Sequence, residues 1–209
     1  KANAIEEWTL FNNRNELDEK VALRLYAYYK AGRFPAPHPG IIHTKIDPNS
    51  IFWEPLLKII RKAESTQTNG KSQEYDSVVH KKPIKGLSSL TIEEAINKVR
   101  TQHPKSKNIG AYQFNMEFME VRWVKAAGLT MNDVFSKETQ DKLAIWLIMN
   151  ERKGKNWLTP PATLSSIDFM LKLSQEWAGL PCPINTVNVN GFTIKKGQSY
   201  WSGVGGNRA

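Results

Sequence analysis

The sequence predicts an α+β fold that is mainly helical and carries small β elements. Several segments place apolar residues at helical spacing between recognisable helix caps. Near the C-terminus, apolar residues at 187, 189, 192 and 194 alternate around Asn190-Gly191, which is typical of a tight hairpin. Residues 65–90 break the helical pattern, because they are polar and rich in turn-forming residues, with one short strand-like stretch at 75–79.

The expected helices follow in order along the chain. Residues 15–32 predict an amphipathic helix within an N-terminal extension, expected at residues 1–48, ahead of a main domain expected at residues 49–209. Thr91 with Glu94 predicts a capping box. Residues 114–127 predict a helix that ends at Gly128, and residues 136–151 a central helix. Ser165 with Asp168 predicts the start of a last helix that runs to residue 178.

The composition excludes several classes of protein. No run of about 18 apolar residues could span a membrane, and the N-terminus lacks the plan of a signal peptide. The sequence does not begin with Met, so we expect a processed or excised chain, compatible with further domains in a longer parent. The lone Cys182 excludes an internal disulfide and is expected to be a packed thiol. Four scattered histidines and the absence of phosphate-binding glycine motifs predict no metal and no cofactor.

The net charge of +9 suggests a polyanionic partner. The excess of basic residues is spread evenly over residues 1–63, 64–110 and 111–209, without the basic stripe of a nucleic-acid interface. A diffuse positive charge suits an extended acidic surface such as the bacterial cell wall, and equally suits an ordinary solvated surface. Nucleic-acid binding is motivated by charge alone.

Glu64 is an unusual residue for its position. It follows Trp53, Leu56, Leu57 and Ile60 at helical spacing, so it falls on an apolar stripe. Apolar surroundings and the negative end of a helix dipole both disfavour a carboxylate anion and would raise its pKa. A carboxyl group that holds its proton near neutrality suits a general acid in glycoside cleavage. The alternative is a helix-terminal glutamate that faces solvent.

A glycosidase often adds a second carboxylate. Asp76, on the polar segment that follows Glu64, is the nearest candidate, and Glu74 is a weaker one. Each could equally be a turn or strand-edge residue.

Four motifs occur in order along the chain: residues 63–79 (AESTQTNG and EYDSVV), IGAYQF at 109–114, EWAGLP at 176–181 and GQSYWSGVGGNRA at 197–209. In this order and at these separations they resemble the lysozyme-like murein-degrading enzymes typified by the bacteriophage lambda endolysin. The resemblance runs from about residue 52 to the C-terminus and implies a two-lobed lysozyme-like fold.

The resemblance also implies an activity: cleavage of peptidoglycan between N-acetylmuramic acid and N-acetylglucosamine, as a bacteriolytic domain of a phage lysin or of a delivered antibacterial effector. It would act on the cell wall in the periplasm of a target or host cell, with Glu64 as the general acid. Either a lytic transglycosylase, which leaves a 1,6-anhydro end, or a hydrolytic muramidase fits. A non-catalytic wall-binding domain on the same fold is the alternative.

By the same resemblance, seven residues are candidates for binding the sugar: Tyr75, Gly110, Tyr112, Gln113, Gln198, Ser199 and Tyr200. The alternative for Tyr112 is a packed tyrosine at a helix entry. Gly110 would let the chain pass close to Glu64, and Tyr200 would close the site. The sequence departs from lambda at Ala111, where arginine stands in that endolysin, and in the short separation of Glu64 and Asp76. That separation is our reason for considering Asp76 as a second catalytic residue, as in hydrolytic phage lysozymes.

Overall fold

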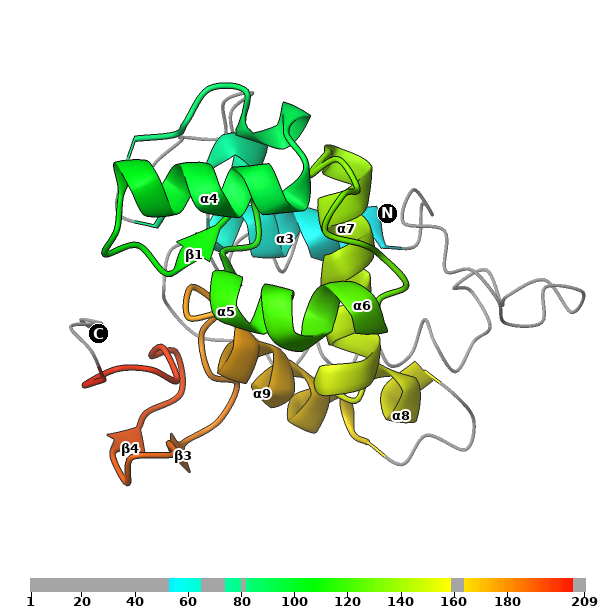
Figure 1. Cartoon of the computed structure of the whole chain (residues 1–209). Helices are drawn as coiled ribbons and strands as arrows, with labels where there is room; N and C mark the ends of the chain where they lie inside the picture. Colours follow the sequence, from blue (N-terminus) through cyan, green and yellow to red (C-terminus); the bar gives the residue numbers. More distant parts are fainter. Residues whose placement is uncertain (1–52, 65–73, 80–81, 159–163, 205–209) are drawn as a thin grey trace, which may run out of the picture. The chain divides into compact units, whose positions relative to one another are not determined.

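The computed structural model describes residues 53–64, 74–79, 82–158 and 164–204 (Figure 1). The predicted N-terminal extension and its helix lie outside the described residues. The described part divides into two compact units, one that ends at Leu147 and one that begins at Ile148. Both are mainly helical, and each contains one small antiparallel strand pair. The predicted mainly helical α+β class is therefore confirmed. No helix among the described residues is long and apolar enough to cross a membrane.

The first unit is built from helices around one antiparallel pair of strands. Its helices are α3 (Glu54–Glu64), α4 (Ile92–Gln102), α5 (Met116–Phe118), α6 (Val124–Ala126) and α7 (Lys137–Trp146), with short 3-10 helices η3 (Glu74–Asp76) and η4 (Leu87–Ser89) and a π-helical turn η5 (Met119–Trp123). Strands β1 (Asn108–Ile109) and β2 (Phe114–Asn115) pair with Ile109 opposite Phe114.

The helix starts follow the predicted capping residues. Thr91 and Glu94 form the predicted capping box of α4, in which each side chain accepts a hydrogen bond from the other residue's backbone N–H. The helix predicted from residue 114 instead starts at Met116, because Phe114 and Asn115 pair with β1 and the Asn115 side chain caps α5. This run of helical turns ends before Gly128, as predicted, where φ is +68°.

The strand-like stretch predicted at 75–79 is mostly not a strand. Residues 74–76 form η3, and within residues 74–79 only Val78 makes a β-bridge, to Ile109. The Asp76 carboxylate accepts hydrogen bonds from the backbone N–H groups of Gly86 and Ser88. These bonds join residues 10 and 12 positions apart, so Asp76 holds η3 against residues 86–88.

The second unit continues from the π-helical turn η6 (Leu147–Glu151) into α8 (Gly154–Leu158) and α9 (Ser166–Glu176), and ends in strands β3 (Thr186–Val187) and β4 (Thr193–Ile194). Ser165 caps α9 as predicted. The hairpin is confirmed, but residues 188–192 connect the strands, so the connection is longer than a two-residue Asn-Gly turn.

Asn188 organises the hairpin connection. Its side-chain oxygen accepts hydrogen bonds from the backbone N–H groups of Asn190 and Phe192, both at 3.0 Å. Behind the hairpin, Cys182 packs with Ile194 and Tyr200 in a buried cluster, so it is the packed thiol that the sequence predicts.

Candidate functional site

Helix α3 places Glu64 at its last position. The apolar face predicted from periodicity is present, since Trp53, Leu57 and Ile60 are buried and Leu56 is half-buried. Glu64 continues this face and is itself half-buried. Glu64 therefore lies at the boundary of the core, where an apolar helix face meets the surface.

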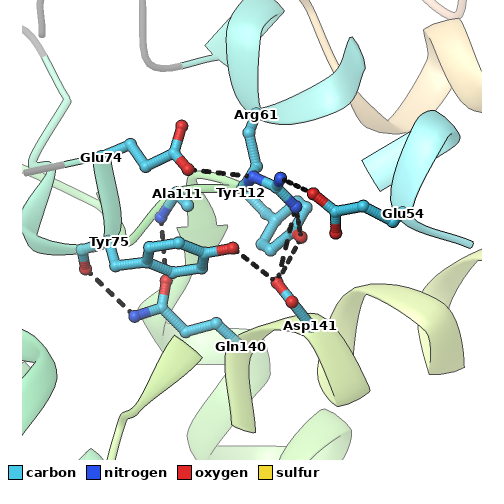
Figure 2. Close-up of polar contacts among 8 residues, drawn as sticks. All are labelled: Glu54, Arg61, Glu74, Tyr75, Ala111, Tyr112, Gln140 and Asp141. Carbon is cyan, nitrogen blue, oxygen red and sulfur yellow. Dashed lines mark hydrogen bonds and ion pairs between the residues drawn. The ribbon is translucent and has the colours of Figure 1, made fainter. Parts of the chain in front are cut away.

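One turn before Glu64, the same helix buries a full positive charge. The Arg61 side chain is only 5% exposed. Its guanidinium donates to Glu54 Oε1 at 2.6 Å, to Glu74 Oε1 at 3.1 Å and to the Tyr112 hydroxyl at 3.0 Å (Figure 2). A buried arginine requires partners of this kind, because an uncompensated charge in the interior is strongly unfavourable.

Helix α7 supplies the facing anion. Asp141 Oδ1 accepts hydrogen bonds from the hydroxyls of Tyr75, at 3.0 Å, and Tyr112, at 2.5 Å. It also lies 3.8 Å from Nη1 of Arg61. Figure 2 shows the tyrosine hydroxyls and the guanidinium converging on this carboxylate. We call this set the Arg61 network: Glu54, Arg61, Glu74, Tyr75, Tyr112 and Asp141.

The neighbour of Asp141 on α7 holds the backbone around the network. The Gln140 side chain accepts a hydrogen bond from Ala111 N at 2.9 Å and donates to the carbonyls of Tyr75 and Phe135, at 3.0 and 2.9 Å. It is fully buried. Since the amide uses both ends, its position is tightly defined, and so is that of the chain at residues 110–111.

The electrostatics of the network keep its donors protonated. Burial by itself lowers the pKa of Arg61, but Tyr112, Glu54 and Tyr75 outweigh it, so the pKa lies above its usual value. Burial, with the nearby Asp141 charge, raises the pKa of both Tyr75 and Tyr112. Burial also raises the pKa of Asp141, against the lowering effect of the two tyrosine hydroxyls and Arg61. Both tyrosines are therefore neutral donors to Asp141.

The turn at residues 110–113 carries three of the sugar-binding candidates. Gly110 is buried with φ +79°, and the space of a Cβ is occupied by Gln140 and Phe135. Tyr112 is 1% exposed and its hydroxyl belongs to the Arg61 network, which favours the packed-tyrosine interpretation.

Gln113 differs from its neighbours in this turn. It has an unusual φ of +50°, is half-buried, and donates from Nε2 to the Gly110 carbonyl at 2.8 Å. Its buried Oε1 has no hydrogen-bond partner among the described residues. A strained backbone and an unused acceptor are features typical of functional positions.

Asp76 directly follows Tyr75 in η3, but its carboxylate binds other partners than the Arg61 network. Its carboxylate is buried and holds the backbone at Gly86 and Ser88, at 2.9 and 2.7 Å. Glu74, the weaker carboxylate candidate, belongs to the Arg61 network instead.

The remaining candidates lie in the second unit, where their polar atoms hold the C-terminal segment together. Gln198 Oε1 accepts a hydrogen bond from Lys195 N at 2.9 Å, and Ser199 Oγ donates to the Ala178 carbonyl at 2.7 Å. Tyr200 is buried in the cluster with Cys182 and Ile194. Of the three, Tyr200 is a core residue, whereas Gln198 and Ser199 are half-buried.

Within the first unit, the structure brings Tyr75 and Tyr112 together on Asp141, and Gly110 and Gln113 into one turn. Sequence reasoning missed Arg61, Asp141 and Gln140. A signal existed: Arg61 follows Leu57 by four residues, so the periodicity that singled out Glu64 places an arginine on the same apolar stripe. Gln140 and Asp141 likewise lie in the first turns of the central helix, shortly before its apolar run.

These features define a mainly helical α+β protein whose first unit is organised around a buried network of ionised and polar side chains at the end of helix α3. A model of the Endolysin family matches residues 54–207, so the chain belongs to the endolysin family. Endolysins degrade peptidoglycan, and the family gives this chain a lytic function on the bacterial cell wall. No curated protein and no solved structure matches the chain.

Proposed function

We propose that this endolysin cleaves peptidoglycan glycan strands between N-acetylmuramic acid and N-acetylglucosamine, with Glu64 as the general acid. The observation that carries the proposal is the half-buried position of Glu64 at the C-terminal end of the apolar face of α3. Both the partial burial and the helix terminus favour a protonated carboxyl group. Membership of the endolysin family indicates that the substrate is peptidoglycan.

In this mechanism the Glu64 carboxyl donates its proton to the glycosidic oxygen as the bond from that oxygen to C1 breaks. A hydroxyl or water oxygen then attacks the positively charged C1, and its proton passes to the Glu64 carboxylate, which restores the acid. Attack by the muramic acid 6-hydroxyl gives a 1,6-anhydro end, and attack by water gives a reducing end. Mass spectrometry of the released fragments separates a transglycosylase from a muramidase.

Gln113 has the strongest support among the sugar-binding candidates. Its unpartnered Oε1 can accept a hydrogen bond from a hydroxyl or an acetamido N–H of the substrate. Tyr75, half-buried, is the next candidate. The internal hydrogen bonds of Gln198 and Ser199 and the burial of Tyr200 support a structural role for these residues.

The proposal uses a single acid. Asp76 is the candidate for a second catalytic carboxylate, but its two backbone hydrogen bonds support a role in holding residues 86–88. We also propose that the fold is lysozyme-like and two-lobed, and that the protein acts in the periplasm of a target or host cell.

The decisive experiment replaces Glu64. Glu64→Gln keeps the size and polarity of the side chain but removes the proton donor, so we expect the rate at which purified peptidoglycan is cleared to fall by about 100-fold or more. Glu93→Gln, at an exposed glutamate of α4, is the matched control and should clear at the wild-type rate. Asp76→Asn, assayed below its unfolding temperature, should retain activity.

If Glu64→Gln clears the suspension as fast as wild type, Glu64 is not the acid. Release of free stem peptides or amino termini in place of glycan fragments would assign the chain to an amidase or peptidase. Binding to peptidoglycan without any cleavage by the wild type would instead support the alternative of a wall-binding domain.

A further inference from the structure

We propose that Arg61, Tyr112 and Asp141 are positioning residues that fix the end of helix α3, and so the direction in which Glu64 presents its carboxyl group. The inference rests on the proposed function, since it assigns a role relative to the proposed acid. None of the three residues is proposed to touch the substrate.

The first step concerns the end of α3. Terminal turns of helices fray, and Glu64 is the last residue of its helix. Arg61 lies one turn earlier on the same side, three residues before Glu64. Its guanidinium is held by Glu54, Glu74 and Tyr112, so the helix is anchored immediately before its last turn.

The second step concerns the chain on either side of the acid. The bond from Arg61 to Glu74 joins the end of α3 to η3. Tyr75, the next residue, donates to Asp141 at 3.0 Å and accepts from Gln140 through its carbonyl. Helix α3 and η3 therefore share one network of hydrogen bonds.

The third step links the acid to the proposed sugar-binding turn. Tyr112 donates to Asp141 and accepts from Arg61, so its single hydroxyl connects α3, α7 and the turn at 110–113. The adjacent Gln140 holds Ala111 N at 2.9 Å. Glu64 and Gln113 are thus positioned by the same anchors, although they come from separate parts of the chain.

The energetics favour a positioning role over a purely stabilising one. A buried ion pair usually contributes no more stability than apolar packing of the same volume. What its directional hydrogen bonds add is a defined geometry. Catalysis depends steeply on geometry, since a displacement of about 1 Å can cost about 100-fold in rate.

The sharpest test is Tyr112→Phe. It removes one oxygen, bonded to Arg61 and Asp141, and keeps the ring that packs 5.5 Å from Phe114. With soluble glycan-strand fragments as substrate, at a temperature where circular dichroism shows a folded variant, we expect kcat to fall by roughly tenfold while KM changes less than about twofold. A merely structural residue would lower the unfolding temperature and leave kcat unchanged in the folded protein.

Two variants at Asp141 provide a graded second test. Asp141→Asn keeps an oxygen that can accept from the tyrosine hydroxyls, whereas Asp141→Ala keeps none. We expect kcat to decrease in the order wild type, Asn, Ala. These variants decide the question if Tyr112→Phe does not fold.

The matched control is Glu120→Gln. It breaks the exposed two-bond pair between Arg100 and Glu120 in the same unit, so kcat should equal that of wild type. If Glu64→Gln is inactive but Tyr112→Phe and both Asp141 variants retain the wild-type kcat, the positioning role is overturned while the acid stands. Activity of Glu64→Gln would instead overturn the proposed function.

Discussion

Position 110 tolerates only glycine for two separate reasons. Its φ of +79° lies in the left-handed region that side chains disfavour. A Cβ built there would also lie 2.5 Å from Gln140 Oε1 and 2.8 Å from Phe135 Cζ. Gln140 cannot easily move, since its side chain makes three hydrogen bonds. The close approach at Gly110 is therefore to α7 and to Phe135.

Gly110→Ala should destabilise the protein through both effects. We expect the free energy of unfolding, measured in urea, to fall by about 3 kcal/mol, combining about 1–2 kcal/mol for the left-handed backbone with about 1–3 kcal/mol for overpacking. Gly128→Ala is the control, because its φ is +68° but nothing lies within 4 Å of the new Cβ. It should lose only about 1–2 kcal/mol. Equal losses would mean that the contact with Gln140 and Phe135 carries no cost.

Two charged residues of α3 contrast at the residue scale. Periodicity drew attention to Glu64, which proved to be half-buried. The fully buried charge is Arg61, three residues earlier on the same helix. An arginine is easily taken for a surface residue in sequence, because its long side chain can reach solvent from many positions. Only its partners reveal that it points inward.

For helices and strands, sequence signals from neighbouring residues predicted several features correctly. The caps of α4 and α9, the end of the helical turns at Gly128 and the C-terminal hairpin all follow from residues within a few positions of one another. The strand-like stretch predicted at 75–79 is mostly wrong. Its Asp76 carboxylate binds the backbone of Gly86 and Ser88, 10 and 12 residues away, and a local sequence pattern does not reveal partners at that distance.

The hairpin depends on Asn188, which joins its connection to the C-terminal turn. Its amide nitrogen donates to the carbonyls of Tyr200 and Ser202, at 3.1 and 3.4 Å, while its oxygen holds residues 190 and 192. The side chain is buried, so its removal would leave buried backbone groups without partners.

Asn188→Ala should lower the free energy of unfolding by about 1–3 kcal/mol. Asn190→Ala, at an exposed position of the same connection, should lower it by less than about 0.5 kcal/mol. Thermal unfolding followed by circular dichroism provides the comparison. A loss at position 188 no larger than that at position 190 would show that the buried amide does not hold the hairpin.

At the scale of the whole molecule, charge is arranged in two ways. The net charge of +9 is spread along the chain, which suits binding to peptidoglycan, the acidic substrate of the family. Around Arg61 the local balance is reversed, since three carboxylates, those of Glu54, Glu74 and Asp141, lie within 4 Å of its guanidinium. Burial raises the pKa of Asp141, and the nearby Glu54 carboxylate adds to this effect.

The raised pKa of Asp141 predicts a specific dependence of stability on pH. Between the unfolded value of about 3.9 and the folded value, the folded state binds more protons than the unfolded state. The contribution of Asp141 is therefore fully present below about pH 3.9 and is lost as pH rises through its folded pKa. Asp141→Asn lacks this titration, so the stability of wild type relative to the variant should decrease as pH rises from about 4.

Urea unfolding of both proteins over a series of pH values measures this difference. Glu93→Gln, at an exposed glutamate, serves as the reference for the general effect of removing one acid. If wild type instead gains stability relative to Asp141→Asn as pH rises, the folded state lowers the pKa of Asp141 and the prediction is wrong.

Local sequence patterns were sufficient to predict the mainly helical class, the capped starts of α4 and α9 and the C-terminal hairpin, and four motifs showed the resemblance to murein-degrading enzymes that the endolysin family match supports. These features depend on hydrogen bonds and periodicities within a few residues. The tertiary structure alone decided that Arg61 is buried against Tyr112, 51 positions away, and that Asp141 accepts from Tyr75 at a separation of 66. Such contacts leave no local pattern, because a buried charge is tolerated only where distant segments fold together and supply its partners.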